Sequence, residues 1–265
     1  MNEFKYCQPD SDCASCGACC GMYNWKGSSR ALVEEVLEFQ TGQFLKSDRG
    51  EKDLLRLKQE ISKSRPAVLY PVIYNCEFLG FTGNGRKRVG CLLHPDLNGG
   101  KNLRRLSDHG RETCDQSRCT AYFYLREAEA ELVAKAVDDW YLYGLALTDL
   151  DLVKEFFRLS SEMVCDAVSA EKVLNRPELK DIFRHYLWLK EKWPYAKDGN
   201  RFGKYFFQAG EYLIYRIDYP ALSAPKSRYD RILNSLGSEF QSRSELWEAE
   251  ELLGQIFQNF RGNWH

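Results

Sequence analysis

The sequence has almost no net charge, and it lacks a long apolar run and an internal repeat. Its 37 lysines and arginines are balanced by 38 aspartates and glutamates, which gives no general attraction to nucleic acid or to an anionic membrane. The strongest central apolar run, residues 67–74, is far too short to cross a bilayer. Residues 1–12 lack the apolar stretch of a secretory signal. These absences predict a cytoplasmic protein with no membrane partner and exclude general nucleic-acid binding by charge.

Cysteine is almost missing from the second half of the chain and dense in the first. Nine of the ten cysteines precede residue 120, and Cys165 alone follows. Four fall within residues 13–20, which read Cys-Ala-Ser-Cys-Gly-Ala-Cys-Cys. Without a secretory signal, this pattern is typical of metal-binding or catalytic cysteines in a reducing compartment rather than of disulfides.

Eight cysteines are therefore predicted to bind metal: Cys13, Cys16, Cys19, Cys20, Cys76, Cys91, Cys114 and Cys119. They could form two four-thiolate sites, or one cluster with spare thiols. The first three repeat a ferredoxin-like C-x2-C-x2-C spacing, whereas structural zinc usually takes two separated C-x2–4-C pairs. The spacing favours an iron–sulfur cluster, and zinc stays open.

Four of the ten cysteines raise separate questions. Adjacent side chains diverge, so Cys19 and Cys20 are not expected to bind one ion in the same way. One of them serves a second site, bridges two ions or simply packs. Cys7 is either a spare ligand or an ordinary thiol in a mobile terminus, and the second interpretation is favoured. Cys165 is interpreted as a small buried hydrophobic residue on a helix.

The first part of the chain predicts two helices and a hairpin. Apolar residues recur at helical spacing from Ser28 or Ser29 to Gly42, and again over Glu51–Lys63. Residues 69–93 predict a β-hairpin with its turn at Gly83-Asn84-Gly85, which places Cys76 and Cys91 on opposite strands facing one site. Residues 97–111 predict a loop held by the metal.

The second part of the chain predicts helices almost to its end. One long helix is expected over 132–147, and Thr148 or Asp149 should cap the next. The remaining starts are expected at Ser169, Pro177, Ser227 and Ser242 or Ser244, with the last helix ending near Gly262. Residues 202–217 are ambiguous between helix and strand.

The predicted fold class is α+β, in two domains. Residues 1–125 should form an irregular, metal-stabilised, cysteine-rich domain with a β-hairpin, and residues 126–265 an all-α helical domain. Because the sequence pattern of the first domain indicates no large apolar core, metal should supply most of its order.

The cysteine motifs, taken in order, resemble a known family. They are the octapeptide from Cys13, Cys76-Glu77-Phe78-Leu79, Gly90-Cys91-Leu92-Leu93-His94-Pro95, and the Cys114 and Cys119 pair followed by Tyr122-Phe123. Over about residues 13–123 they resemble the bacterial YkgJ-like cysteine-cluster family, described as zinc- or iron-chelating. The resemblance implies a thiolate metal centre in a small cytoplasmic protein. The chain departs from the family in its long insert before Cys114 and its helical extension.

Two other functions remain open beside simple metal binding. A distant similarity to the flagellin lysine methylases raises the possibility of an enzyme, but the sequence has no Gly-rich nucleotide-binding loop to support that activity. A metalloenzyme of unknown substrate would need an open metal position or an acid or base such as Glu77, His94 or Asp96. His94 and His109 could also be ligands; otherwise His94 caps a strand and His109 lies in solvent.

The third function is a zinc-dependent interaction or nucleic-acid-binding module. Two basic patches support it: Arg86-Lys87-Arg88, and Lys101 with Arg104 and Arg105. A solvated hairpin tip and loop explain these patches equally well. The sequence names no protein or small-molecule partner and no oligomeric state.

Overall fold

The computed structural model describes residues 4–83, 85, 87–197 and 205–264, and they form two compact units. The first, here called the cysteine unit, comprises Lys5–Cys119 and Asp139–Gly144. The second, the helical unit, comprises the rest of the described chain. Helices predominate and strands are few, so the α+β fold class is confirmed.

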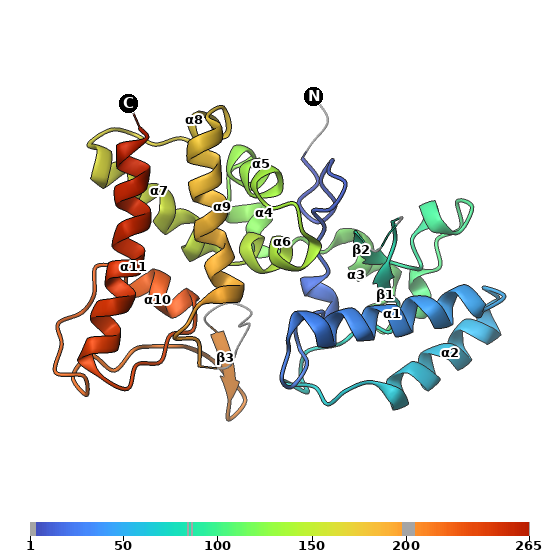
Figure 1. Ribbon diagram of the computed structural model, residues 1–265. Helices are drawn as coiled ribbons and strands as arrows, with labels where there is room; N and C mark the ends of the chain where they lie inside the picture. The colour runs from blue at the N-terminus through green and yellow to red at the C-terminus, as the bar shows by residue number, and fades with distance from the viewer. Residues whose placement is uncertain (1–3, 84, 86, 198–204, 265) are drawn as a thin grey trace. The chain divides into compact units, whose positions relative to one another are not determined.

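Two helices and a short sheet form the body of the cysteine unit (Figure 1). Helix α1 (Arg30–Lys46) begins where the Ser29 hydroxyl accepts a hydrogen bond from the Leu32 amide at 3.3 Å, as the sequence predicted. Helix α2 (Glu51–Ser64) confirms the prediction for Glu51–Lys63. The prediction that Gly42 ends the first helix is wrong. α1 continues for another turn, because Phe44 packs into the core and is 2% exposed.

The predicted hairpin over residues 69–93 is much shorter in the structure. Strands β1 (Leu79–Phe81) and β2 (Val89–Cys91) pair antiparallel, with Leu79 opposite Cys91. A Cβ on Gly80 would lie 2.5 Å from the Thr41 hydroxyl, so glycine lets α1 approach β1 this closely. Thr41 also accepts a hydrogen bond from the Phe81 amide at 2.8 Å. Asn84 of the predicted turn lies outside the described residues.

The cysteine unit has an apolar core, which corrects the expectation that it would have little. Side chains from α1, α2 and β1 fill this core, each at most 7% exposed: Val33, Leu37, Phe44, Leu54, Leu57, Ile61, Phe78, Leu79 and Phe81. Burying apolar side chains on this scale stabilises the body of the unit without metal. Any dependence on metal is therefore expected to concentrate in the segments outside α1, α2 and the sheet.

The loop predicted over residues 97–111 is partly helical. Two short 3-10 helices, η3 (Pro95–Leu97) and η4 (Arg104–Leu106), are followed by α3 (Gly110–Gln116). Cys114 lies on α3. The turns in this segment are stabilised by local hydrogen bonds, which a search for apolar periodicity does not detect. Asn98, for example, donates to the carbonyl oxygens of Leu92 and His94 at 2.9 and 2.8 Å.

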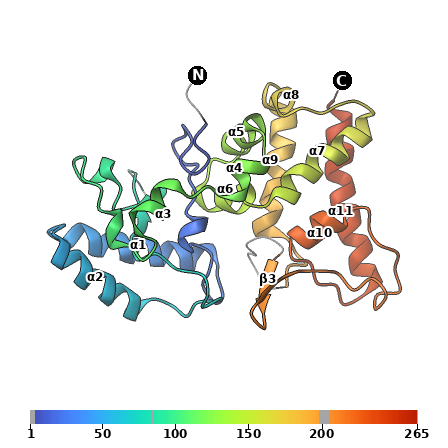
Figure 2. The ribbon, with the colours of Figure 1, turned by 180° about the vertical axis from the view of Figure 1, so that it is seen from behind.

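The helical unit contains most of the remaining helices, among which α7, α9 and α11 pack together (Figures 1 and 2). Its helices are α4 (Thr120–Tyr124), α5 (Glu127–Ala136), α7 (Leu150–Val164), α8 (Ala170–Leu174), α9 (Pro177–Lys192), α10 (Asp230–Ser235) and α11 (Arg243–Gly262). The predicted caps at Asp149 and Ser242 and the first-turn proline at Pro177 are confirmed.

An aromatic cluster forms the core of the helical unit. The Phe156 ring lies 4.7 Å from Phe183, 5.1 Å from Tyr186 and 5.3 Å from Phe260, measured between ring centroids. Phe257 and Phe260 are fully buried. Core packing thus explains the helical spacing of these two aromatic residues.

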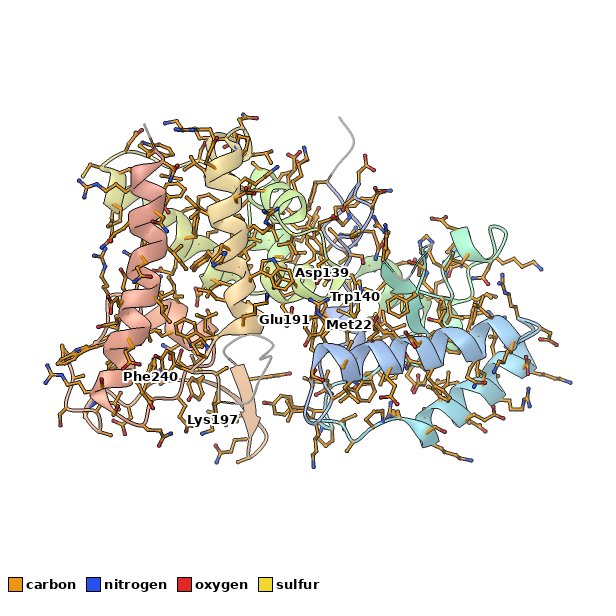
Figure 3. The ribbon with its side chains drawn as sticks, in the orientation of Figure 1. Met22, Asp139, Trp140, Glu191, Lys197 and Phe240 are labelled. Carbon is orange, nitrogen blue, oxygen red and sulfur yellow. The ribbon has the colours of Figure 1, made fainter. Side chains whose placement is uncertain are left out.

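The single helix predicted over 132–147 is wrong, because α5 ends at Ala136 and α6 (Trp140–Leu147) begins anew. The Asp139 carboxylate accepts a hydrogen bond from the Leu142 amide at 2.7 Å. It also receives two hydrogen bonds from the Arg30 guanidinium, at 2.6 and 2.9 Å. Asp139 and Trp140, labelled in Figure 3, therefore start a separate helix, whose residues up to Gly144 belong to the cysteine unit.

The second part of the chain is not all helical, and Cys165 is not buried. Strands β3 (Tyr205–Gln208) and β4 (Glu211–Ile214) form an antiparallel hairpin in the ambiguous stretch. Residues 202–204 lie outside the described residues. Cys165 is exposed, because it ends α7 in a left-handed conformation with φ 55°. Ser227 does not start a helix; it accepts a hydrogen bond from the Tyr229 amide, and α10 begins at Asp230.

Among the described helices, none combines the length and the apolar character required to cross a membrane.

Candidate metal centre

The N-terminal segment that carries Cys7 and Cys13 is held along β2. The Arg88 guanidinium donates hydrogen bonds to the carbonyl oxygens of Pro9 and Ser11 and to the Gln8 side chain. Ser15 accepts a hydrogen bond from the Val89 amide at 2.8 Å. The Cys16 amide donates to the Cys7 carbonyl at 2.9 Å. Cys7 therefore lies beside the octapeptide, in a segment that has hydrogen-bond partners within the cysteine unit.

A short 3-10 helix, η1 (Ala18–Cys20), presents the last two cysteines of the octapeptide. It ends at Gly21, whose φ is +79° and whose added Cβ would lie 2.5 Å from the Tyr74 carbonyl. The Cys76 amide donates to the Cys20 carbonyl at 2.9 Å. This contact brings Cys20 beside Cys76 although 56 positions (76 − 20) separate them in the sequence.

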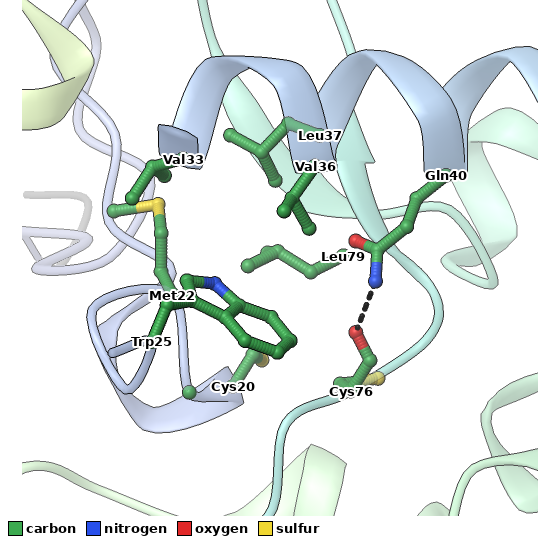
Figure 4. A pocket seen from close by; sticks show the side chains of 10 residues that line it. Cys20, Met22, Trp25, Val33, Val36, Leu37, Gln40, Cys76 and Leu79 are labelled. Atoms are coloured by element: carbon green, nitrogen blue, oxygen red, sulfur yellow. Dashed lines mark hydrogen bonds between the residues drawn. The ribbon is translucent and has the colours of Figure 1, made fainter. Parts of the chain in front are cut away.

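Cys76 precedes β1 and Cys91 ends β2, so the two cysteines are not opposite each other on paired strands as predicted. Gln40 of α1 donates to the Cys76 carbonyl at 3.3 Å (Figure 4). A charge on Cys91 nevertheless disfavours ionisation of Cys76. Burial, with this repulsion, raises the pKa of Cys76 to about 12.

The first group of thiols consists of Cys7, Cys16, Cys19 and Cys119, and every pair among them interacts. The Cys7 thiol donates a hydrogen bond to Cys119, which, with burial and the charges of Cys16 and Cys19, raises the Cys7 pKa far above its usual value. Burial and the charge on Cys19 raise the pKa of Cys16. Helix α6 borders this group: a Cβ added to Gly144 would lie 3.3 Å from the Cys16 sulfur.

The second group consists of Cys20, Cys76, Cys91 and Cys114. Cys20 interacts with Cys76 and Cys91, and Cys91 also interacts with Cys114. Burial raises the pKa of Cys91 to about 11, although the Arg104 charge lowers it. The Cys114 sulfur lies 3.5 Å from the Ser107 hydroxyl, within hydrogen-bonding distance. Neighbouring thiolates repel one another, so without a cation such a group holds its protons.

Cys19 and Cys20 join the two groups. The Cys20 thiol donates a hydrogen bond to the Cys19 sulfur, which lowers the pKa of Cys19 to about 7 and raises that of Cys20. The two adjacent side chains otherwise have different neighbours. Cys19 interacts with Cys119, and Cys20 interacts with Cys76. Each therefore belongs to a different group.

Thiolates are suitable ligands for a soft metal ion. In this structure, however, the cysteine side chains are not arranged around a common point. Over the residues that the structure describes, no three histidine, cysteine, aspartate or glutamate side chains are placed to hold one ion. Cys13, half-buried with its amide donating to Ser11 at 3.3 Å, remains a predicted ligand.

The candidate acids and bases have structural roles. The Glu77 carboxylate is buried and accepts hydrogen bonds of 2.6 Å from both Ser62 and Tyr74. His94 caps η3 rather than a strand, accepting a hydrogen bond from the Asp96 amide at 3.3 Å. His109 is half-buried and its ring packs edge-on against Tyr74.

The basic residues near the thiols are engaged within the chain. Arg88 binds the N-terminal segment, Arg104 forms an ion pair with Asp115, and Arg105 forms two 2.7 Å hydrogen bonds with Glu51. Lys101 is exposed, and Arg86 lies outside the described residues. These internal contacts reduce the positive charge that the patches could offer to a nucleic acid.

A small cavity lies beside the second group of thiols, lined by Cys20, Cys76, Trp25, Gln40 and neighbouring apolar side chains (Figure 4). Its volume is about 10 Å³, which is close to the minimum for one water molecule. The cavity is too small for an organic substrate.

Comparisons with protein-family models, curated proteins and solved structures found no match to this chain.

The low pKa of exposed Cys19 predicts a selectively reactive thiol in metal-free protein. In a Cys165→Ala background, which removes another exposed thiol, alkylation of Cys19 should rise with pH and reach half its maximum near pH 7. Protonation below that pH removes the thiolate and slows the reaction. Cys20→Ala, which removes the hydrogen-bond donor, should move the midpoint upward. An unchanged midpoint, followed by peptide mass spectrometry, would contradict this pairing.

Proposed function

We propose that this protein binds zinc or an iron–sulfur cluster through cysteine thiolates of the cysteine unit. The observation that supports the proposal is the convergence of Cys7, Cys16, Cys19, Cys20, Cys76, Cys91, Cys114 and Cys119 from separate segments of one unit. The ten cysteines all lie in the described part of the chain, and none forms a disulfide. Reduced thiols in such numbers suit a cytoplasmic setting.

Burial and mutual repulsion disfavour ionisation of these thiols. Metal binding would account for their presence together in one unit. A soft cation stabilises thiolates directly, so the energetic cost of placing several of them together is offset when metal binds. Zinc would act as a structural cross-link between the N-terminal segment, η1 and the segment after β2. An iron–sulfur cluster would take the same thiolates and add redox chemistry.

Binding is favoured over catalysis by the surroundings of the thiols. Glu77 and His94 are engaged in local hydrogen bonds, and the cavity beside Cys20 and Cys76 has room for about one water molecule. The resemblance to the YkgJ-like family points to the same function and stays a prediction.

The direct test is metal analysis of full-length protein purified without oxygen. We expect at least one equivalent of tightly held zinc or iron per chain. Acid-labile sulfide and absorption near about 400 nm identify an iron–sulfur cluster, and their absence with zinc present identifies zinc. Cys165→Ser should retain all of the metal, because Cys165 lies in the helical unit. Folded protein without metal, in which every thiol titrates, would overturn the proposal.

A further inference from the structure

The last residue of the basic stretch Arg86-Lys87-Arg88 is engaged within the protein. Arg88 is half-buried just before β2, and its guanidinium donates to the Gln8 side chain at 3.0 Å. Both terminal nitrogens donate to the Pro9 carbonyl at 3.2 Å, and the Ser11 carbonyl accepts a further hydrogen bond. All three acceptor residues lie between the first two cysteines of the chain.

We propose that Arg88 is a positioning residue for metal binding, which holds the cysteines of the N-terminal segment (residues 5–16) in place through the planar fork of its guanidinium. The inference rests on the proposed metal binding and adds a residue that is not itself a ligand. It gives this part of the basic stretch a role inside the protein rather than in contact with phosphates.

The N-terminal segment has little regular structure of its own. Residues 5–16, all of which the structure describes, include no helix and no strand. Its own backbone hydrogen bonds include one from the Gln8 amide to the Lys5 carbonyl at 3.2 Å. Irregular backbone has no repeating ladder of hydrogen bonds, so its order depends on other groups that satisfy its polar atoms. Thiols on such a segment need support from outside it to keep a fixed geometry.

Arg88 and its neighbour Val89 supply this support from the start of β2. The Val89 amide donates to the Ser15 hydroxyl at 2.8 Å, and Ser15 is fully buried. The Val89 carbonyl accepts from the Gln8 side chain at 2.8 Å, and the same side chain accepts from Arg88. Two adjacent residues therefore hold the middle and the end of the segment.

Ser11 connects Arg88 to the cysteines. Its carbonyl accepts from Arg88, and its hydroxyl accepts from the amides of Cys13 and the residue after it, at 3.3 and 3.0 Å. Cys7 lies one residue before Gln8, the other side chain that accepts from Arg88. Loss of the guanidinium contacts would therefore loosen the backbone beside the thiols of Cys7 and Cys13.

The shape of the guanidinium matters here as well as its charge. The acceptors of Arg88 are two backbone carbonyls and an amide side chain, all uncharged, although the exposed residues Asp10 and Asp12 lie in the same segment. Several neutral acceptors suit a rigid fork of N–H donors, whereas lysine offers one flexible nitrogen. We therefore expect that lysine cannot replace Arg88, which it could do if positive charge alone were required.

The test measures metal release from full-length protein purified without oxygen, as zinc or iron passes to an excess of a chromogenic chelator. Arg88→Lys should release metal about ten- to hundredfold faster than wild type, the usual effect of losing a group that supports metal ligands. Arg105→Lys is the matched control, because it removes a guanidinium from an exposed pair with Glu51 and should leave the rate unchanged. Release from Arg88→Lys at the wild-type rate overturns the proposal. Wild-type protein without metal overturns the proposed function and this inference with it.

A second measurement separates local support from overall stability, and it uses protein from which metal has been removed without oxygen. Alkylation of each cysteine is followed by peptide mass spectrometry. In Arg88→Lys, Cys7 and Cys13 should react at least about tenfold faster than in wild type, because the hydrogen bonds of the fork are lost. Cys91 and Cys114 should react as before. Equal acceleration at all four cysteines, or none at Cys7 and Cys13, contradicts a positioning role for Arg88.

Discussion

Removing the metal is expected to increase amide hydrogen exchange by at least about a hundredfold, or roughly 2.7 kcal/mol, in residues 5–21 and 91–119. These segments carry seven of the eight proposed ligands and lie outside the pairing of α1 with α2. Structural metal contributes on the order of 10 kcal/mol to small thiolate domains, so the expected loss of protection is large. Exchange is measured with and without a strong chelator.

The same experiment contains its own controls. α1 and α2 share a buried core that includes Leu37, Phe44, Leu54 and Ile61, each at most 2% exposed. Their amides should stay protected, as should those of α9 and α11 in the helical unit. Loss of protection in α1 would show that the whole cysteine unit depends on metal. Unchanged protection everywhere would show that metal does not order these segments.

Asp149→Ala is expected to destabilise the helical unit by about 3–5 kcal/mol, because it leaves a buried charge without its partner. The Lys190 ammonium and the Asp149 carboxylate are 1% and 4% exposed and lie 2.9 Å apart. Asp149 also accepts hydrogen bonds from the Ser235 hydroxyl at 2.9 Å and the Leu152 amide at 3.1 Å. One substitution therefore removes an ion pair and a helix cap together.

Urea unfolding followed by circular dichroism measures this effect. The matched control is Asp181→Ala, which breaks an exposed pair with Arg184 on α9 and should cost no more than about 1 kcal/mol. Adding Lys190→Met to Asp149→Ala should recover part of the loss, because the unpaired charge is then gone. Equal effects of Asp149→Ala and Asp181→Ala would show that the buried pair adds nothing beyond a surface pair.

Local sequence signals predicted much of the helical structure. Ser29, Asp149 and Ser242 cap helices as expected, because a side-chain oxygen one residue before the helix satisfies an amide in its first turn. Apolar residues at helical spacing located α2, α7 and α11. Such features depend on residues a few positions apart, so the sequence contains them directly.

Predictions failed where a distant contact outweighed a local signal. Gly42 did not end α1, because Phe44 beyond it packs in the core. The long helix over 132–147 was interrupted because Asp139 pairs with Arg30 and caps α6. The core of the cysteine unit was underestimated because α1, α2 and β1 each bring a modest apolar face, and only their packing together makes a core.

The sequence by itself determined that nine thiols crowd into the first 119 residues, and hence that a metal centre is the chemistry to test. The tertiary structure alone decided which thiols are neighbours. Arg88 holds the segment after Cys7, and the Cys20 carbonyl accepts from the Cys76 amide, through contacts between residues 56 to 80 positions apart. Spacing along the chain constrains such pairs weakly, because closing a long loop costs little more than closing a shorter one.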